Sequence, residues 1–348
     1  MKRKIFSAVL CLLVVFCSCA VCPAEETSVS CEEADELIQD AWEAYAAEAG
    51  EDEERLEEIS AVEEYSDGII CEMSQNDRTM RYFVTVRGEP DENGLYPLYI
   101  TLHGGGGAPA EANDEQWQQM CEYYKGRVEN GIYVACRGIE DEWNLHFRDE
   151  SYAFYDRLIS NMILFAGADP NRVYLMGFSA GGDGVYAISP RMADRFAAVN
   201  MSSGHPNGVS MLNMANLPIA IQVGVRDFYS ESVMRCVRGA EMENILNSLR
   251  EKYGFGYPHQ VWVHVPEGHN FSDYEEVECK VLADPAVFAE RAAEEDWLDD
   301  FLALPGASGM DVMGLSYAYY DETELNEQVE ELLKNEKGMD IVSDMTCA

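Results

Sequence analysis

Hydrophobic and polar positions follow two patterns that alternate over most of the chain. Short apolar runs predict buried strands, at Tyr82–Val86, Leu98–Leu102, Ile132–Cys136, Val173–Met176, Ala197–Met201, Ile219–Val223 and Val261–Val265. Longer stretches with helical spacing lie between them, at about 114–126, 150–166, 181–195 and 231–253. Strands that alternate with helices predict an α/β fold with a mostly parallel central sheet flanked by helices. Ligands of such sheets bind at the carboxyl ends of the strands.

Both ends of the chain have a different, acidic pattern. Residues 25–64 hold 17 acidic residues and one basic residue, Arg55, around a partial helical stripe that includes Leu37 and Trp42. We expect an acidic helical lead-in over 25–65 that packs its stripe on the main domain; a separate partner-binding segment is the alternative. A second acidic helix is expected over 322–337, in a C-terminal extension at 306–348. The main domain therefore spans 66–305.

The first 24 residues have the order of an export signal. Basic residues at 2–4 precede an apolar run over 5–16, and small residues follow at Ser18, Ala20 and Ala24. The sequence predicts a signal peptide over 1–24 and a secreted chain. A retained membrane anchor is the alternative, but the run is short of the ~20 residues that a span requires. Cys19 loosely resembles a lipoprotein cleavage site, so we expect membrane attachment only if Cys19 carries a lipid.

Charge and cysteine content exclude several classes of protein. The 348 residues carry 24 Lys and Arg against 64 Asp and Glu, a formal net charge of −40, which argues against a nucleic-acid partner. Beyond residue 24, seven cysteines are scattered without the paired spacing of a zinc site. We expect no metal site.

The motif that most specifically indicates a reactive residue surrounds Ser179. Gly177-Phe178-Ser179-Ala180-Gly181 directly follows the strand expected at 173–176 and precedes a helix. In that setting the serine occupies a sharp turn with its hydroxyl exposed, and the helix N-terminus points amides at developing negative charge. The pattern predicts a nucleophilic serine; a glycine turn with an idle serine is the alternative.

A glycine-rich loop, His103-Gly104-Gly105-Gly106-Gly107, follows the strand at 98–102. Because glycine has no side chain, the backbone amides of this loop are accessible to a ligand. This suits an oxyanion hole, in which one loop amide acts together with the amide of Ala180. We expect the loop donor to be Gly105 or Gly106. A phosphate-binding loop is the weaker alternative, because no Gly-Lys-Ser/Thr follows.

A serine nucleophile needs a base and an orienting carboxylate. Asp227 and His269 each follow an expected strand, in the chain order serine, acid, base. We therefore predict a Ser179, Asp227 and His269 triad. His205 is a rival base that breaks this order, and Asp183 is a rival acid that we expect to brace the helix or loop instead.

Four further side chains are candidates for the substrate pocket: His103, Trp143, His146 and His205. His103 is expected mainly to organise the glycine loop. For the cluster around His146, packing in the core or at the surface is an equal alternative. An aromatic wall over 137–160 would suit an acyl, aryl or sugar group.

These motifs together resemble the α/β-hydrolase family, and more narrowly its exported esterase/peptidase-like branch with polyhydroxybutyrate-depolymerase-like and feruloyl-esterase-like proteins. The resemblance covers about residues 70–305 and rests on His103–Gly107, Asp169–Arg172, Gly177–Gly182, Asp227 and Gly268-His269. It implies an eight-strand-type sheet, a serine triad and no cofactor, but no substrate. Because only 17 residues separate the strands at 197–201 and 219–223, we expect no large lid there.

The expected function is that of a secreted serine hydrolase that cleaves carboxylic esters through an acyl-enzyme intermediate. Its substrate would be a small-molecule ester or an acyl or aryl ester linked to a polysaccharide. A serine peptidase of the same fold and a non-catalytic surface binding module are the alternatives.

Overall fold

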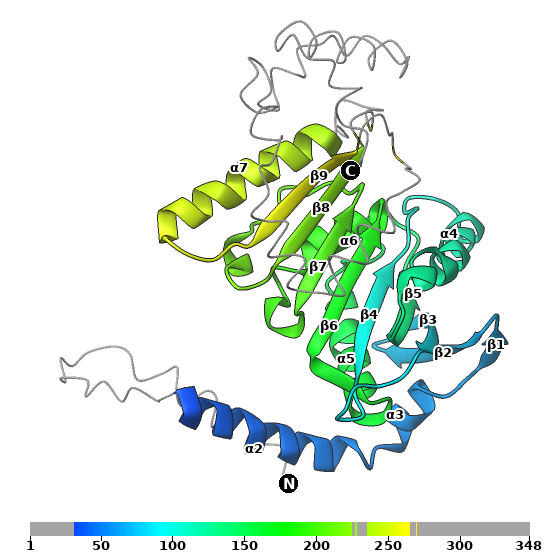
Figure 1. Cartoon of the computed structure of the whole chain (residues 1–348). Helices are drawn as coiled ribbons and strands as arrows, with labels where there is room; N and C mark the ends of the chain where they lie inside the picture. The colour runs from blue at the N-terminus through cyan, green and yellow to red at the C-terminus, as the bar shows by residue number, and fades with distance from the viewer. Residues whose placement is uncertain (1–30, 225–226, 228–234, 265–268, 270–348) are drawn as a thin grey trace, which may run out of the picture. The chain divides into compact units, whose positions relative to one another are not determined.

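The computed structural model describes residues 31–224, 227, 235–264 and 269 of the chain (Figure 1). The expected signal peptide, Cys19 and the acidic C-terminal extension lie outside the described residues. Residues up to Glu51 form one unit and residues from Asp52 onward form another. The described part of the first unit is a single helix, α2 (Cys31–Ala49), which the acidic, amphipathic pattern predicts.

The second unit is built on a nine-stranded sheet. Its strands are β1 (Glu63–Tyr65), β2 (Gly68–Gln75), β3 (Arg78–Arg87), β4 (Tyr96–Leu102), β5 (Gly131–Cys136), β6 (Ala168–Phe178), β7 (Ala198–Ser202), β8 (Ile219–Gly224) and β9 (His259–His264). They lie in the order β1-β2-β3-β5-β4-β6-β7-β8-β9. β1, β2 and β3 pair antiparallel with their neighbours, and every pair from β5 to β9 is parallel. The predicted mostly parallel sheet is confirmed.

Helices cover both faces of this sheet (Figure 1). They are α3 (Glu53–Glu58), α4 (Ala110–Tyr123), α5 (Ser151–Phe165), α6 (Ala180–Ile188) and α7 (Arg235–Tyr253), with short 3-10 turns η1 (Lys125–Arg127), η2 (Ala193–Arg195) and η3 (Leu212–Met214). The predicted helices are confirmed at four places. The expected helix over 181–195 ends at Ile188, and only a 3-10 turn follows at η2.

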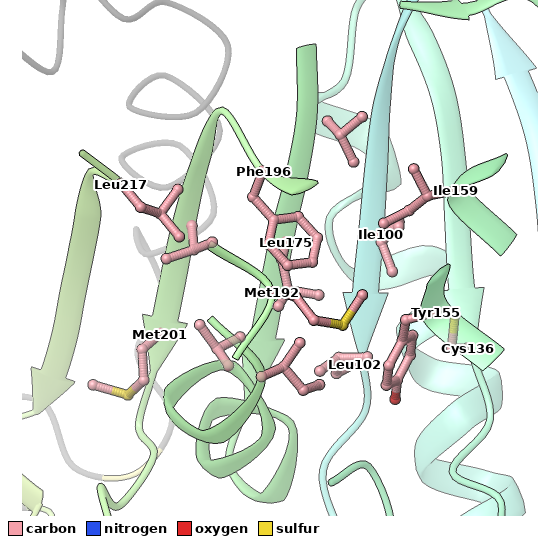
Figure 2. Close-up of a cluster of buried hydrophobic side chains, with 14 of the residues drawn as sticks. Ile100, Leu102, Cys136, Tyr155, Ile159, Leu175, Met192, Phe196, Met201 and Leu217 are labelled. Atoms are coloured by element: carbon pink, nitrogen blue, oxygen red, sulfur yellow. The ribbon is translucent and has the colours of Figure 1, made fainter. Parts of the chain in front are cut away.

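The two faces of the sheet follow from the alternation of side chains along each strand. On β4, Leu98, Ile100 and Leu102 pack on one face, and Tyr99 packs on the other. Helices α5, α6 and α7 cover the first face, where the larger cluster of buried side chains lies (Figure 2). Helix α4 covers the second face through residues such as Trp117.

The strand register brings the ends of β4, β6 and β7 to one edge of the sheet. Leu102 pairs with Gly177, and Phe178 pairs with Ser202. His103, Ser179 and Ser203 therefore leave their strands side by side. The segment between β7 and β8, where no large lid is expected, is described in full and holds only the turn η3.

Candidate active site

Ser179 occupies a strained turn between β6 and α6. Its backbone has φ 58° and ψ −119°, a region that L-residues rarely adopt. The turn is held because the Ser179 amide donates to the Ser202 carbonyl oxygen over 2.9 Å and the Ser179 carbonyl accepts from the Asp183 amide over 3.0 Å. The serine thus caps α6, where the predicted elbow places it.

The glycines on either side of Ser179 are required by close backbone contacts. A Cβ on Gly177 would lie 2.1 Å from the carbonyl oxygen of Gly181, and a Cβ on Gly181 would lie 2.0 Å from that of Leu102. No side chain fits at either distance. The Gly-x-Ser-x-Gly spacing therefore follows from how tightly α6 packs against β6 and β4.

His269 links Ser179 to Asp227. Its Nε2 atom lies 3.0 Å from the Ser179 hydroxyl oxygen, and its Nδ1 atom lies 2.9 Å from Oδ2 of Asp227. Asp227 is completely buried, whereas His269 is partly exposed. With Nδ1–H donating to the carboxylate, Nε2 is free to accept the serine proton. The structure thus brings the three predicted residues together, and it is His269 rather than His205 that bridges the other two.

Two residues that were not predicted from the sequence, Arg235 and Ser203, hold the acid and the base in place. Arg235 Nη1 donates to Oδ1 of Asp227 over 3.3 Å, and the Arg235 amide donates to the Asp227 carbonyl over 3.2 Å. The buried hydroxyl of Ser203 donates to the carbonyl oxygen of His269 over 3.0 Å. Ser203 follows a strand directly, a position that could have marked it as a site residue.

The backbone amides of the glycine loop differ in whether they already have a hydrogen-bond acceptor. The Gly106 amide donates to Oδ1 of Asn113 over 2.8 Å, so it is already occupied. The amides of Gly105 and Ala180 have no hydrogen-bond acceptor among the residues that the structure describes. Of the two expected loop donors, the geometry leaves Gly105 available and not Gly106.

Asn113, on α4, was not predicted as a site residue. Its side chain is fully buried, and its Nδ2 atom donates to the Ala108 carbonyl over 3.2 Å and to Oδ1 of Asp141 over 2.9 Å. Asp141 in turn pairs with Arg137. Asn113 therefore connects the C-terminal end of the glycine loop to the segment after β5. Its position, as a polar residue in the first turn of the helix that follows the loop, could have marked it as a site residue.

His103 and His146 are packed in the core rather than exposed to a substrate pocket, which fits the expected role of His103 in organising the loop and the packing alternative for His146. Both are fully buried and their rings pack edge to face, 4.7 Å apart. The Gly138 amide donates to His103 Nε2 over 3.1 Å, so His103 Nδ1–H donates to the Gly104 carbonyl over 2.5 Å. His146 Nε2 lies 2.9 Å from the His103 carbonyl oxygen. The two histidines thus support the glycine loop from its buried side.

Burial keeps these two histidines neutral. It lowers the pKa of His146 to about 4. Burial, and the neighbouring His146, lower the pKa of His103 well below its ordinary value. Neither is placed or poised to act as a base near neutral pH.

His205 lies in a loop that Asp183 braces. The His205 amide donates to Oδ1 of Asp183 over 2.7 Å, and Asn207 Nδ2 donates to Oδ2 over 3.0 Å. Burial raises the pKa of Asp183 and lowers that of His205. Asp183 thus has the bracing role that was expected of it, and a contact of His205 with substrate stays a prediction.

Aromatic side chains lie next to Ser179 and at the glycine loop. The Phe178 ring lies between Tyr123 and His269, at ring distances of 5.6 and 5.1 Å. Trp143 is 57% exposed, packs on Phe147, and lies beside the backbone of Gly107. Trp143 is thus at the rim of the glycine loop, where its role in substrate binding remains a prediction.

No group of three or more His, Cys, Asp or Glu side chains suited to a metal ion occurs in the described part of the chain. Over the same residues, no helix has the length and apolar character needed to cross a membrane.

Comparison with known proteins gives structural likeness only. No family model matches the chain, and no curated protein matches it. Among solved structures, it is similar to a thermostable esterase (15% identity, TM-score 0.46), covering 67% of this chain and 62% of that one. The poly(3-hydroxybutyrate) depolymerase LpqC of Bordetella parapertussis is 17% identical, with a TM-score of 0.49 and coverage of 68% and 96%.

An acylaminoacyl peptidase of Pyrococcus horikoshii is also similar, at 14% identity and a TM-score of 0.43 over 66% of this chain and 42% of that one. This chain spans less than two thirds of the thermostable esterase and of the peptidase. At such identities we take no activity or substrate from these proteins. The mostly parallel sheet flanked by helices and the turn at Ser179 are those of the α/β-hydrolase fold, with the edge strand β1 as a ninth strand beyond the eight expected.

Proposed function

We propose that this protein is a serine hydrolase that cleaves carboxylic esters. The observation that carries the proposal is the position of His269, in hydrogen-bond reach of both Ser179 and Asp227. A structural role for these residues would not require a serine at a strained φ of 58° with an available base beside it.

In the proposed reaction the Ser179 oxygen attacks the ester carbonyl carbon while His269 Nε2 takes the hydroxyl proton. The carbonyl π electrons move onto oxygen, which the amides of Gly105 and Ala180 stabilise. The tetrahedral intermediate then expels the alcohol, which receives the proton from His269. A water molecule then attacks the acyl-enzyme in the same way, with His269 taking its proton and returning it to Ser179, and the carboxylic acid is released. Asp227 orients His269 and stabilises its charged form.

We further propose that the natural substrate is a neutral ester. The net charge of −40 repels polyanions at long range. Phe178, and the exposed Trp143 at the rim, offer apolar surface for an acyl or aryl group. We also propose export of the chain, on the strength of its first 24 residues.

Short p-nitrophenyl esters and blocked peptide anilides, tested side by side, distinguish the enzyme classes. We expect ester hydrolysis that is lost in Ser179→Ala. Faster cleavage of the anilide would replace the esterase proposal with a peptidase, and no cleavage of either would favour a binding module.

A further inference from the structure

The carboxamide of Gln116 lies beside the nucleophile without a protein partner. A Cβ on Gly104 would lie 3.0 Å from the side-chain oxygen of Gln116 and 3.3 Å from Cβ of Ser179. Both side chains therefore border the space that a side chain on Gly104 would fill. Within the described part of the chain, the Gln116 side chain makes no hydrogen bond.

The position of Gln116 is fixed by the helix that carries it. On α4, Asn113 is one turn earlier and bonds the Gly106 amide, so both side chains lie on the face toward the glycine loop. The indole N–H of Trp117, the next residue, donates to the Ala135 carbonyl over 2.9 Å and ties α4 to β5. Gln116 is half-buried, and its Cγ atom would lie 3.5 Å from a Cβ atom added to Gly105.

A further donor would add to an oxyanion site in which one of the expected backbone amides is already occupied. Asn113 occupies the amide of Gly106, so two backbone amides remain, those of Gly105 and Ala180. Rotation about the Cγ–Cδ bond of Gln116 exchanges its oxygen and nitrogen, which turns an N–H toward the gap at Gly104.

We propose that Gln116 is a further catalytic residue, whose side-chain N–H donates a hydrogen bond to the substrate carbonyl oxygen as negative charge develops on it. The proposal rests on the proposed function and adds a third donor to the oxyanion site. A donor that acts on developing charge raises kcat more than it lowers KM.

The test compares wild-type protein with Gln116→Met, Gln116→Glu and the matched control Gln119→Met. Gln119 is exposed on the same helix. Loss of one oxyanion donor in other hydrolases costs about 10²–10³ in kcat. For a side-chain donor, which is held less firmly than a backbone amide, we expect a loss of roughly 10- to 10²-fold in Gln116→Met, with KM within about twofold. Gln116→Glu keeps the shape but cannot donate when ionised, so its loss should be at least as large.

An aryl boronic acid, which binds the serine as a tetrahedral adduct, provides a second readout. Its inhibition constant should rise by the same factor as kcat falls in Gln116→Met, while Gln119→Met should match wild type. If Gln116→Met keeps kcat within about threefold, or loses kcat/KM through KM alone, Gln116 is not an oxyanion donor. If wild-type protein itself hydrolyses no ester, the proposed function fails, and this inference with it.

Discussion

The hydroxyl of Ser203 donates a hydrogen bond to the backbone carbonyl of His269 across 3.0 Å. The residue before it, Ser202, accepts from the Ser179 amide. The end of β7 therefore holds the proposed base through a side chain and the proposed nucleophile through the backbone. This shared support explains how residues 90 positions apart can keep a 3.0 Å contact.

Ser203→Ala should lower kcat by roughly tenfold, because the buried hydrogen bond to His269 contributes about 1–1.5 kcal/mol that is needed in the transition state. Ser203 has φ 48°, a conformation that glycine adopts without strain. Ser203→Gly should therefore lose activity equally while retaining more stability than Ser203→Ala. Steady-state kinetics and urea denaturation of both variants check this. Full activity in either variant would show that the hydroxyl does not position His269.

Asn113→Ala should reduce kcat by roughly 10- to 10²-fold, because the glycine loop loses its tie to the segment after β5 and the Gly105 amide is no longer held in place. We expect a smaller change in KM. Kinetics with a p-nitrophenyl ester, together with the free energy of unfolding, provide the measurement. Unchanged kcat in a folded variant would contradict the proposed role of the loop.

Much of this fold is predictable from the sequence, because β4, β5, β7, β8 and the second half of β6 are mostly apolar and buried on both faces. β2 was missed although its Cys71 and Met73 are buried and Glu72 and Ser74 are exposed. That alternation is typical of a strand with one buried face. Its polar residues interrupt the continuous apolar run from which the other strands were predicted.

The site could be predicted only where a motif determines the geometry. Ser179 and the chain order of Asp227 and His269 followed from the elbow and the strand ends. For His103 and His146 the sequence left both a pocket and a packing role open, because proximity to a glycine loop does not tell whether a ring faces the substrate or the core. Asn113 and Gln116 are brought to the loop by the packing of α4, which local spacing does not reveal.

His146→Gln should flatten the pH dependence of stability in acid. The pKa of His146 is lowered to about 4 in the folded state, against about 6.5 when unfolded. Between these values the unfolded chain binds more protons, so wild-type stability falls as the pH falls from 6.5 to 4. This histidine contributes up to about 1.4 kcal/mol per pH unit.

Glutamine keeps an N–H where His146 Nε2 bonds the His103 carbonyl, but it does not titrate. Urea denaturation of both proteins across this range provides the comparison, because the two chains differ in titratable groups only at residue 146 and His146 is a smaller cause than burial of the lowered pKa of His103. Parallel curves for wild type and variant would mean that His146 is not a buried neutral histidine.

Labelling with a fluorophosphonate tests the central claim, that His269 and Asp227 make Ser179 a nucleophile, most directly. Intact-mass spectrometry should find one adduct per folded chain, peptide mapping should place it on Ser179, and labelling should be absent in Ser179→Ala and much slower in Asp227→Asn. A folded wild-type protein that takes up no label, or takes it up at another residue, would contradict the account.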